Sequence, residues 1–240
     1  KSSDYFNTKL YTGNNTSTSY TGVGFQPDWI WIKDRSQAAD HTLIDAVRGV
    51  KKVIISNSTN AEGTDSSTQG LNSFDSDGFT LGTNSNVGST NNTGDNYVAW
   101  NWKANGSGSA NSDGSDSSTV SANTTAGFSI VKWTPSGGNA TVGHGLGAVP
   151  EMMISFRIDG SQDRFVYHKD IGNTKYVRLN QTTAPTTDAN AWNNTTPTSS
   201  VFSVGSQFGG SDSVQYCFTS VKGFSKIGSY TGNQNADGSF

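Results

Sequence analysis

The alternation of apolar and polar residues near the N-terminus predicts three consecutive β-strands. Each is a short run rich in β-branched and aromatic residues and bounded by turn-forming residues. The runs are Trp29–Lys33, Thr42–Val47 and Lys52–Ser56. Neighbouring side chains of a strand point to opposite faces, so Trp29 and Trp31 share one face and the intervening Ile30 lies on the other. Large apolar groups on both faces predict a central strand that is covered on both sides.

Two later runs alternate more strictly. They are Tyr97–Lys103 and Ser213–Thr219. In the first run every second residue is apolar, including Trp100 and Trp102, and the opposite face carries Asn101. In the second run Cys217 takes the place of this asparagine. The pattern predicts that each strand has one buried and one exposed face.

The chain repeats itself at a constant spacing. A shift of 123 residues places identical residues on one another over a long span. The matched pairs include Pro27 and Pro150, Gly49 and Gly172, Lys52 and Lys175, Asn57 and Asn180, and Phe79 and Phe202. The same shift places Met152 on Trp29, so the position stays apolar while the residue changes, which is typical of a core position rather than of a ligand contact. We therefore predict a tandem array of one module.

Three related segments mark where the modules begin: YFNTKLYTGN, GFSIVKWTPSG and GFSKIGSYTGN. They predict a first module over residues 5–126, a second over residues 127–222, and a third over residues 223–240 that is started and truncated. Residues 104–125 are rich in Gly and Ser, which predicts an inter-module linker at the end of the first module that is flexible unless it packs against a sheet. A longer parent chain with further modules is therefore expected.

Composition favours an all-β fold. Hydrophobic residues make up 32% of the chain and charged residues 15%, and much of the remainder is Gly, Ser, Thr and Asn. These residues have low helix propensity and suit tight turns between short strands. The predicted fold is two tandem antiparallel β-sandwiches, each with two sheets around its own core.

Charge and cysteine content argue against several classes of protein. The net charge is −3, which gives no electrostatic basis for binding nucleic acid or an anionic membrane. No apolar run approaches the ~20 residues of a membrane-spanning helix. The lone cysteine, Cys217, cannot form a disulfide within the chain, so stability must come from strand pairing, core burial and oligomerisation.

Several signatures of the sequence together resemble a repeated domain of tailed-phage structural proteins that is common in marine phages. They are FQPDWIWIKDRS, SFDSDGFTLG, YVAWNWKA, GHGLGAVPEMMI and GFSKIGSYTGN. The resemblance covers nearly the whole chain and brings no catalytic residues with it. It implies a protein of the virion surface or another extracellular location, such as a tail or head fibre, with other virion proteins and further copies of itself as partners. By analogy it also implies lectin-like jelly-roll sandwiches similar to concanavalin A.

Catalytic chemistry has little support in the sequence. A glycoside hydrolase needs two carboxylates placed as acid and base or nucleophile. The two glutamates, Glu62 and Glu151, lie far apart in sequence. Asp75 and Asp77 precede a glycine and fit a turn. We predict a non-enzymatic protein without a cofactor. A polysaccharide-degrading phage spike is the alternative, and it requires Asp75 or Asp77 to lie beside another carboxylate.

The strongest candidates for ligand binding lie in a polar loop. Trp192 is followed by Asn193 and Asn194, and an indole ring with amide neighbours suits the binding of a sugar. Trp133, beside Pro135, is the second candidate.

Metal binding has a weaker candidate in the predicted linker. Asp113 and Asp116 supply oxygen ligands of the kind that calcium prefers, but they do not match an EF-hand loop. The three histidines are scattered and lack the spacing of metal ligands.

The function predicted from the sequence is structural and adhesive. Repeated modules of a virion appendage would extend from the particle and bind host surface glycans through many weak contacts. A cellular surface-layer or extracellular-matrix adhesin built from the same modules would have the same sequence features, so it is a second alternative.

Overall fold

The computed structural model describes residues 1–233 and confirms the all-β class. The N-terminal strands are β1 (Phe6–Thr12), β2 (Thr18–Thr21), β3 (Trp29–Asp34), β4 (His41–Asp45), β5 (Lys52–Ile55), β6 (Gly63–Thr64), β7 (Leu71–Asp75), β8 (Gly78–Leu81) and β9 (Asn96–Trp102). The C-terminal strands are β10 (Ser109–Asn111), β11 (Ser118–Asn123), β12 (Phe128–Trp133), β13 (Ala140–Gly143), β14 (Met152–Arg157), β15 (Phe165–His168), β16 (Lys175–Arg178), β17 (Thr186–Thr187), β18 (Val201–Val204) and β19 (Ser213–Phe218). Helical segments are short: α1 (Ala189–Trp192) and the 3-10 turns Ser2–Asp4 and Ser206–Phe208.

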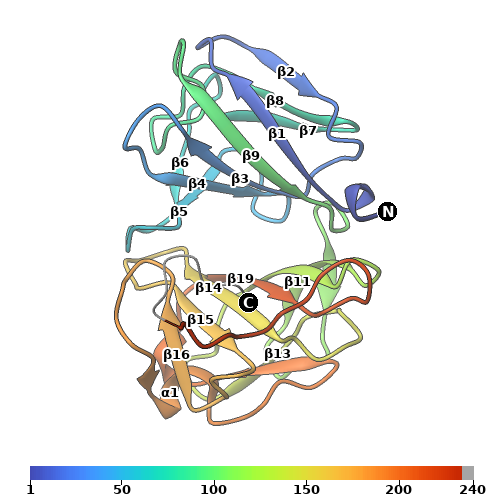
Figure 1. Ribbon diagram of the computed structural model, residues 1–240. Helices are drawn as coiled ribbons and strands as arrows, with labels where there is room; N and C mark the ends of the chain where they lie inside the picture. Colours follow the sequence, from blue (N-terminus) through green and yellow to red (C-terminus); the bar gives the residue numbers. More distant parts are fainter. Residues whose placement is uncertain (234–240) are drawn as a thin grey trace.

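The strands form four stacked layers (Figure 1). In the first half, residues 1–104, a three-stranded outer sheet (β2-β8-β7) covers a six-stranded inner sheet (β1-β9-β3-β4-β5-β6). In the second half, residues 105–222, the inner sheet has eight strands (β10-β11-β12-β19-β14-β15-β16-β17) and the outer layer is the pair β13-β18. The two inner sheets face each other in the middle of the molecule.

The two inner sheets have the same strand order. The order β1-β9-β3-β4-β5-β6 in the first half corresponds to β12-β19-β14-β15-β16-β17 in the second. Within both sheets the paired strands run antiparallel. The repeat of sequence at a shift of 123 residues is therefore also a repeat of topology.

Residues 104–125 pack against a sheet, so of the two outcomes that the sequence left open they do not form a flexible linker. They contain β10 and β11, which extend the inner sheet of the second half beyond β12. Val120 is buried in the core of that half, and the Ser118 hydroxyl donates to the Gly143 carbonyl oxygen at 3.1 Å. The low-complexity composition concealed a strand in which Val120 and Ala122 point inward between small polar residues.

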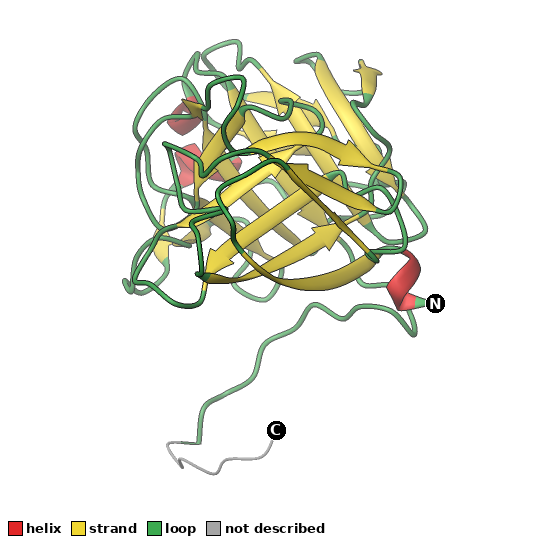
Figure 2. Ribbon diagram, turned by 90° about the horizontal axis from the view of Figure 1, so that it is seen from above, coloured by secondary structure: helices red, strands yellow, loops and turns green. Residues whose placement is uncertain are grey.

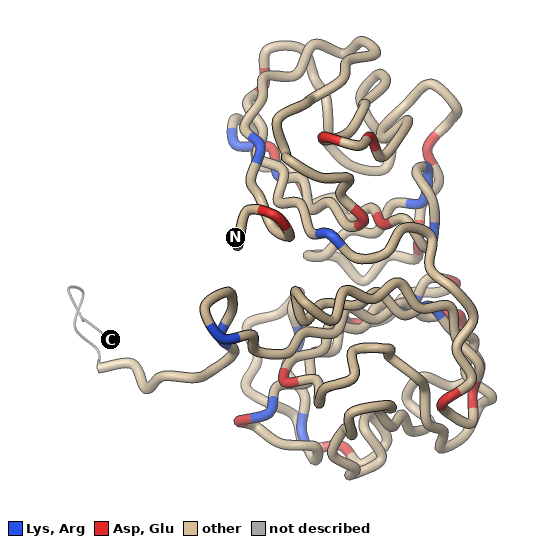
Figure 3. The backbone as a smooth tube through the Cα atoms, turned by 90° about the vertical axis from the view of Figure 1, so that its right-hand side faces the viewer, with Lys and Arg blue, Asp and Glu red and all other residues tan. Residues whose placement is uncertain are grey.

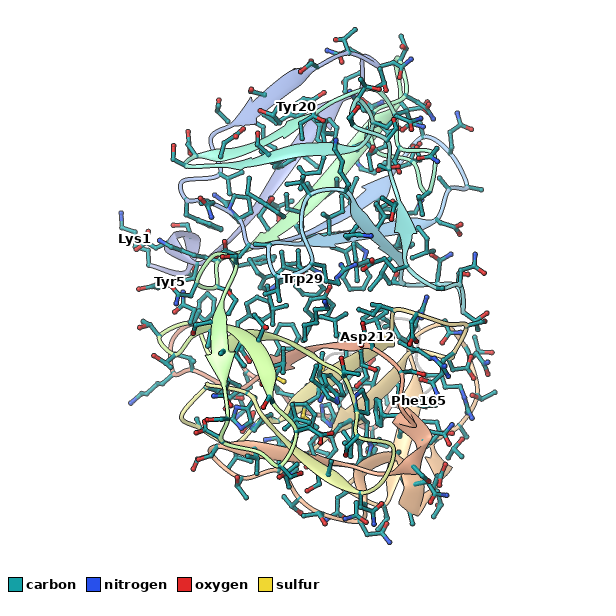
Figure 4. All side chains as sticks on the ribbon, turned by 180° about the vertical axis from the view of Figure 1, so that it is seen from behind. Lys1, Tyr5, Tyr20, Trp29, Phe165 and Asp212 are labelled. Atoms are coloured by element: carbon teal, nitrogen blue, oxygen red, sulfur yellow. The ribbon has the colours of Figure 1, made fainter. Side chains whose placement is uncertain are left out.

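Three apolar clusters fill the spaces between the four layers. The middle cluster joins the halves, because its side chains come from both inner sheets. Trp29 lies within it at 1% exposure, stacked on Tyr216 with ring centroids 4.1 Å apart and close to Trp102 at 4.3 Å. Figure 4 shows Trp29 between the two halves. The prediction of a strand covered on both sides is confirmed, since Ile30 and Ile32 lie in the core of the first half.

The prediction of one exposed face was wrong for β9 and β19. Asn101 and Cys217 point into the cores of their own halves and are fully buried. The opposite faces carry Trp102 and Tyr216, which pack into the middle cluster. The other half of the chain covers this second face fully at Tyr216 and in part on β9.

The predicted third module is not folded as a module in the described part of the chain. Residues 223–233 contain no strand, and Figure 2 shows them leaving the body of the molecule. Phe224 packs edge-on against Tyr5, with ring centroids 6.1 Å apart. The segment that begins at residue 223 resembles β1, and to form a strand it would need a free strand edge like the one that β9 offers to β1. Within residues 1–233, both β9 and β19 already have a strand on each edge. Residues 234–240 of this prediction lie outside the described residues.

Candidate functional site

Trp192 and Trp133 are core residues, so neither is the surface platform that the sequence suggested. Trp192 is 1% exposed, and its indole N–H donates to the Lys175 carbonyl oxygen at 3.0 Å. Trp133 is equally enclosed and packs against Phe202, with ring centroids 5.4 Å apart. Both rings help to close the core of the second half, which has only two strands in its outer layer.

Asn193 and Asn194 end the short helix α1. Both adopt the left-handed backbone conformation, with φ values of 50° and 48°. Asparagine tolerates this conformation better than most residues, which accounts for its choice here. The two amides lie at or near the surface while the Trp192 ring points inward, so the predicted group of an indole with two amides is not assembled.

Asp113 and Asp116 serve local structure. The Ser136 backbone N–H donates to Asp116 at 3.0 Å, and the Asn111 side-chain amide donates to Asp113 at 2.9 Å. Within residues 1–233 no three His, Cys, Asp or Glu side chains come together as a metal site would require. The calcium prediction therefore gains no support from geometry.

Asp75 and Asp77 hold the β7–β8 hairpin in place. The Ser73 and Thr80 hydroxyls donate to Asp75, each at 2.6 Å. The backbone N–H groups of Gly22 and Gly24 donate to Asp77, and these bonds lower the pKa of its carboxyl. The partners of both carboxylates are hydroxyls and backbone groups, as expected for a turn rather than for an acid–base pair.

The inner sheet of the first half carries an aromatic surface that is only partly covered. Three rows of cross-strand neighbours lie on the face that points toward the second half. They are Phe6, Trp102, Trp29 and Asp45; then Thr8, Trp100, Trp31 and Leu43; then Leu10, Val98, Lys33 and His41. Trp29 in the first row is 1% exposed, Trp31 and Trp100 in the second row are half-buried, and in the third row Leu10 is 59% exposed while Val98 beside it is buried. We call the half-buried and exposed residues Leu10, Trp31, Lys33, His41 and Trp100 the aromatic face.

The polar groups of the aromatic face are mostly bonded within the chain. The Trp31 indole N–H donates to Nδ1 of His41 at 3.0 Å. The Lys33 ammonium donates to the carbonyl oxygens of Asp34 and Gln37. Burial, together with the nearby Lys33 charge, lowers the pKa of His41, so the imidazole is neutral at pH 7. Trp31 and Trp100 meet edge to face, with ring centroids 6.3 Å apart.

A polar cleft lies where the two halves meet. It has a volume of ≈ 340 Å³ and is lined by Arg48, Lys52, Glu62, Lys132, Ile158, Asp159 and Asp212. Figure 3 shows Lys, Arg, Asp and Glu distributed over both halves, and Figure 4 labels Asp212 near the junction. The cleft combines both signs of charge, so it has no strong preference for a cation or an anion.

The charges deep in this cleft are already paired. The Arg48 guanidinium contacts Asp45 at 2.5 Å, Glu62 at 3.0 Å and the Tyr216 hydroxyl at 3.2 Å. The Tyr216 hydroxyl in turn donates to Asp45 at 2.7 Å. Burial alone would lower the pKa of Arg48, but the carboxylates of Asp45 and Glu62 outweigh it and raise the pKa. Since Tyr216 belongs to the second half, the group is an ionic link between the halves.

Arg164 makes a second polar link across the junction. Its buried guanidinium donates to the carbonyl oxygens of Ile55 and Asn60 in the first half. Arg164 forms no salt bridge among the described residues, and burial lowers its pKa to about 10. The backbone of the same region is joined by hydrogen bonds from Glu62 N to Ile158 O and from Gln162 N to Thr59 O.

The described geometry therefore defines an all-β protein of stacked antiparallel sheets with an internal repeat and a shared core. The chain belongs to the family described as Domain of unknown function (DUF7483), whose model matches residues 1–240. No curated protein matches the chain. No solved structure matches it either. In the described part of the chain, no helix has the length and apolar character needed to span a membrane.

The sequence contained a partial signal for the aromatic face. Trp100 lies in a strictly alternating run, whereas the run of Trp31 carries large apolar residues on both faces. Whether these strands are neighbours depends on the order β9-β3, which places the two indoles opposite each other. The alternation identifies the shared face of each run, but only the packing of the halves decides how much of that face stays open.

Proposed function

We propose that the chain is a non-enzymatic structural component of a surface appendage, of the virion-fibre type that the sequence resemblance implies. Its two halves act as one stiff segment. The observation that carries this proposal is the continuous apolar cluster between the inner sheets, centred on Trp29 and Tyr216. A segment that must transmit force or hold a spacing benefits from such a joint, because two domains on a flexible linker would move independently.

The proposal includes a jelly-roll arrangement for each half, similar to that of lectins. Each half has two sheets that enclose their own apolar cluster, which supports a sandwich architecture. Antiparallel sheets packed in this way are common in surface and capsid proteins, so the architecture fits an extracellular structural role by analogy.

The absence of enzymatic activity is part of the same proposal. The carboxylates at the cleft bind neighbouring cations or backbone groups: Glu62 contacts Arg48 and Lys52, and Asp159 contacts Arg157. Such pairing supports a role in holding the halves together. A panel of bacterial surface polysaccharides incubated with the chain should show no new reducing ends.

Glycan binding, which the sequence favoured, loses its predicted residues. Trp192 and Trp133 are enclosed, and the tryptophans that lie partly open are Trp31, Trp100 and Trp102. If the chain binds sugars, these rings supply the stacking surface, and weak contacts would add up over many copies.

Single-molecule pulling tests the stiff segment directly. The chain, held by handles at both ends, should unfold in one event that releases both halves together. Two separate events, each with the length of one half, would contradict the proposal. An antibody against the chain tests the location, because it should label the surface of virus particles or cells in electron micrographs. Labelling confined to the cytoplasm would exclude an appendage.

A further inference from the structure

We propose that a second copy of the chain packs on the aromatic face, so that Leu10, Trp31 and Trp100 of two copies meet around a two-fold axis. This inference goes beyond the structural role proposed above, because it assigns a specific self-association surface. The face belongs to the inner sheet of the first half and is exposed at its outer row.

The aromatic face continues an interface that exists within the chain. The first of the three rows, with Trp29 and Trp102, is covered by the second half. The rows with Trp100 and Leu10 lie on the same sheet face directly beside it. The shared core is formed by this face packed against the equivalent face of the other half. Within the chain, this sheet face is therefore covered by an equivalent apolar sheet face.

The second half shows what full coverage looks like. The apolar residues of its equivalent rows are Ile130, Tyr216 and Ile154, then Val214 and Phe156. All of these side chains are at most 6% exposed, because the first half lies over them. The counterparts of Tyr216 and Ile154 in the first half are Trp100 and Trp31, and both are half-buried. Leu10, at 59% exposure, takes the position that Lys132 has in the second half. The two positions that are enclosed in the second half are therefore partly open in the first half, and the exposed Leu10 adds to the apolar surface beside them.

The chemistry of the face favours a protein surface over a sugar. A sugar needs hydrogen-bonding groups around the stacking ring, but Trp31, Lys33 and one nitrogen of His41 are already bonded within the chain. The remaining surface consists of ring edges, the Leu10 side chain and the exposed Thr8, and its apolar part gains most from an apolar partner. The neutral His41 adds no charge to such a contact.

Self-complementarity favours a two-fold contact. The exposed large hydrophobic residues within residues 1–233 are Leu10, Val149, Leu179 and Tyr230. Of these, Leu10 alone lies in a strand. A head-to-tail contact would need a second exposed apolar sheet surface, whereas an isologous contact uses the same surface twice.

Sedimentation velocity of the 240-residue chain, from low micromolar to millimolar concentration, tests the proposal. The chain should show a concentration-dependent dimer. The Leu10→Lys variant should associate at least about tenfold more weakly, because two copies of the side chain leave the contact. The matched control is Leu179→Lys, at a residue that is 38% exposed and far along the sequence, and it should associate like the natural chain. A chain that stays monomeric at every concentration, or equal effects of both variants, would overturn the proposal.

A cysteine variant gives a second readout that does not depend on affinity. The only cysteine, Cys217, is fully buried, and burial raises its pKa to about 12, so it does not compete. Under mild oxidation Leu10→Cys should form a disulfide-linked dimer much faster than Leu179→Cys. Equal rates would contradict the two-fold contact. A glycan array decides the remaining alternative: sugar binding by a monomeric chain, lost in Trp100→Ala, would show that the face binds glycans and would replace the dimer.

Discussion

The two halves share one topology, yet equivalent residues have different environments. Trp100 in β9 and Tyr216 in β19 occupy corresponding positions, but Trp100 is half-buried and Tyr216 is fully enclosed. The outer edge of β12 is covered by β11, whereas within residues 1–233 the same edge of β1 has no strand beside it. The comparison teaches that the position of a repeat within the packed chain, as well as its sequence, decides which side chains become core.

The largest expected effect is at the centre of the shared core. Trp29→Ala should lower the free energy of unfolding by about 3–5 kcal/mol, because a large buried ring leaves a cavity between the halves. The equivalent change in the second half, Met152→Ala, should cost about 1–2 kcal/mol, since Met152 is only half-buried. Urea unfolding of both variants measures the difference. Equal costs would contradict the asymmetry of the two halves.

Breaking the ionic link between the halves should cause the next largest loss in the free energy of unfolding. Asp45→Ala removes the partner of the buried Arg48 and should destabilise the chain by about 3 kcal/mol. The doubly substituted Asp45→Leu, Arg48→Met chain should recover much of this loss, because no unpaired charge stays buried. A double variant that is less stable than Asp45→Ala would show that the link contributes more than charge compensation.

Arg164 and His41 occupy equivalent positions and offer a third comparison. Arg164→Leu leaves the Ile55 and Asn60 carbonyl oxygens without their donor and should cost about 2 kcal/mol. His41→Leu, at the half-open position, should cost less than about 1 kcal/mol. Thermal unfolding of the two variants side by side is the measurement, and the reverse order would refute the assignment of Arg164 as a link between the halves.

Hydrogen exchange of backbone amides should distinguish the open edge of β1 from the edge of β12 that β11 covers. Lys132 in β12 is paired with Thr119 of β11, whereas the corresponding Leu10 in β1 has a partner strand on one side alone. Its backbone N–H should exchange on the order of 100-fold faster than that of Lys132. Comparable protection in dilute solution, where the chain is monomeric, would mean that another segment covers β1.

The smallest effect concerns pH. Burial lowers the pKa of His144, so the folded chain resists protonation while the unfolded chain takes up a proton near pH 6.5. The contribution of neutral His144 to the free energy of unfolding is therefore fully present above pH 6.5. It is lost as the pH falls toward the lower pKa that His144 has in the folded chain. His144→Gln should flatten the decline in stability between pH 7 and pH 5. An unchanged slope would assign that decline to other groups.

The all-β class and the positions of the main strands followed from the alternation of apolar residues. The runs at Trp29, Thr42 and Tyr97 are strands β3, β4 and β9, because a two-residue period is a local property of the sequence. The repeat indicated that the second half would have the same strands in the same order.

The errors share one physical cause. Burial of Trp192, strand formation at residues 109–123 and coverage of the second face of β9 all depend on contacts between segments far apart in the chain. Composition alone made residues 104–125 resemble a linker, and a polar loop made Trp192 resemble a surface residue. The openness of the aromatic face likewise could not be predicted from the sequence, because it depends on how one half is placed over the other.

The shared middle layer also has an evolutionary consequence. A gene that lost one half of this chain would encode a sheet with Trp29 and Trp102 open to water, and a gene that gained a single half would add an unmatched apolar face. Duplication or recombination that copies or removes both halves together would leave no apolar sheet face uncovered. We therefore expect the heritable unit of this architecture to be the doublet, with array lengths in related genes changing by two repeats at a time.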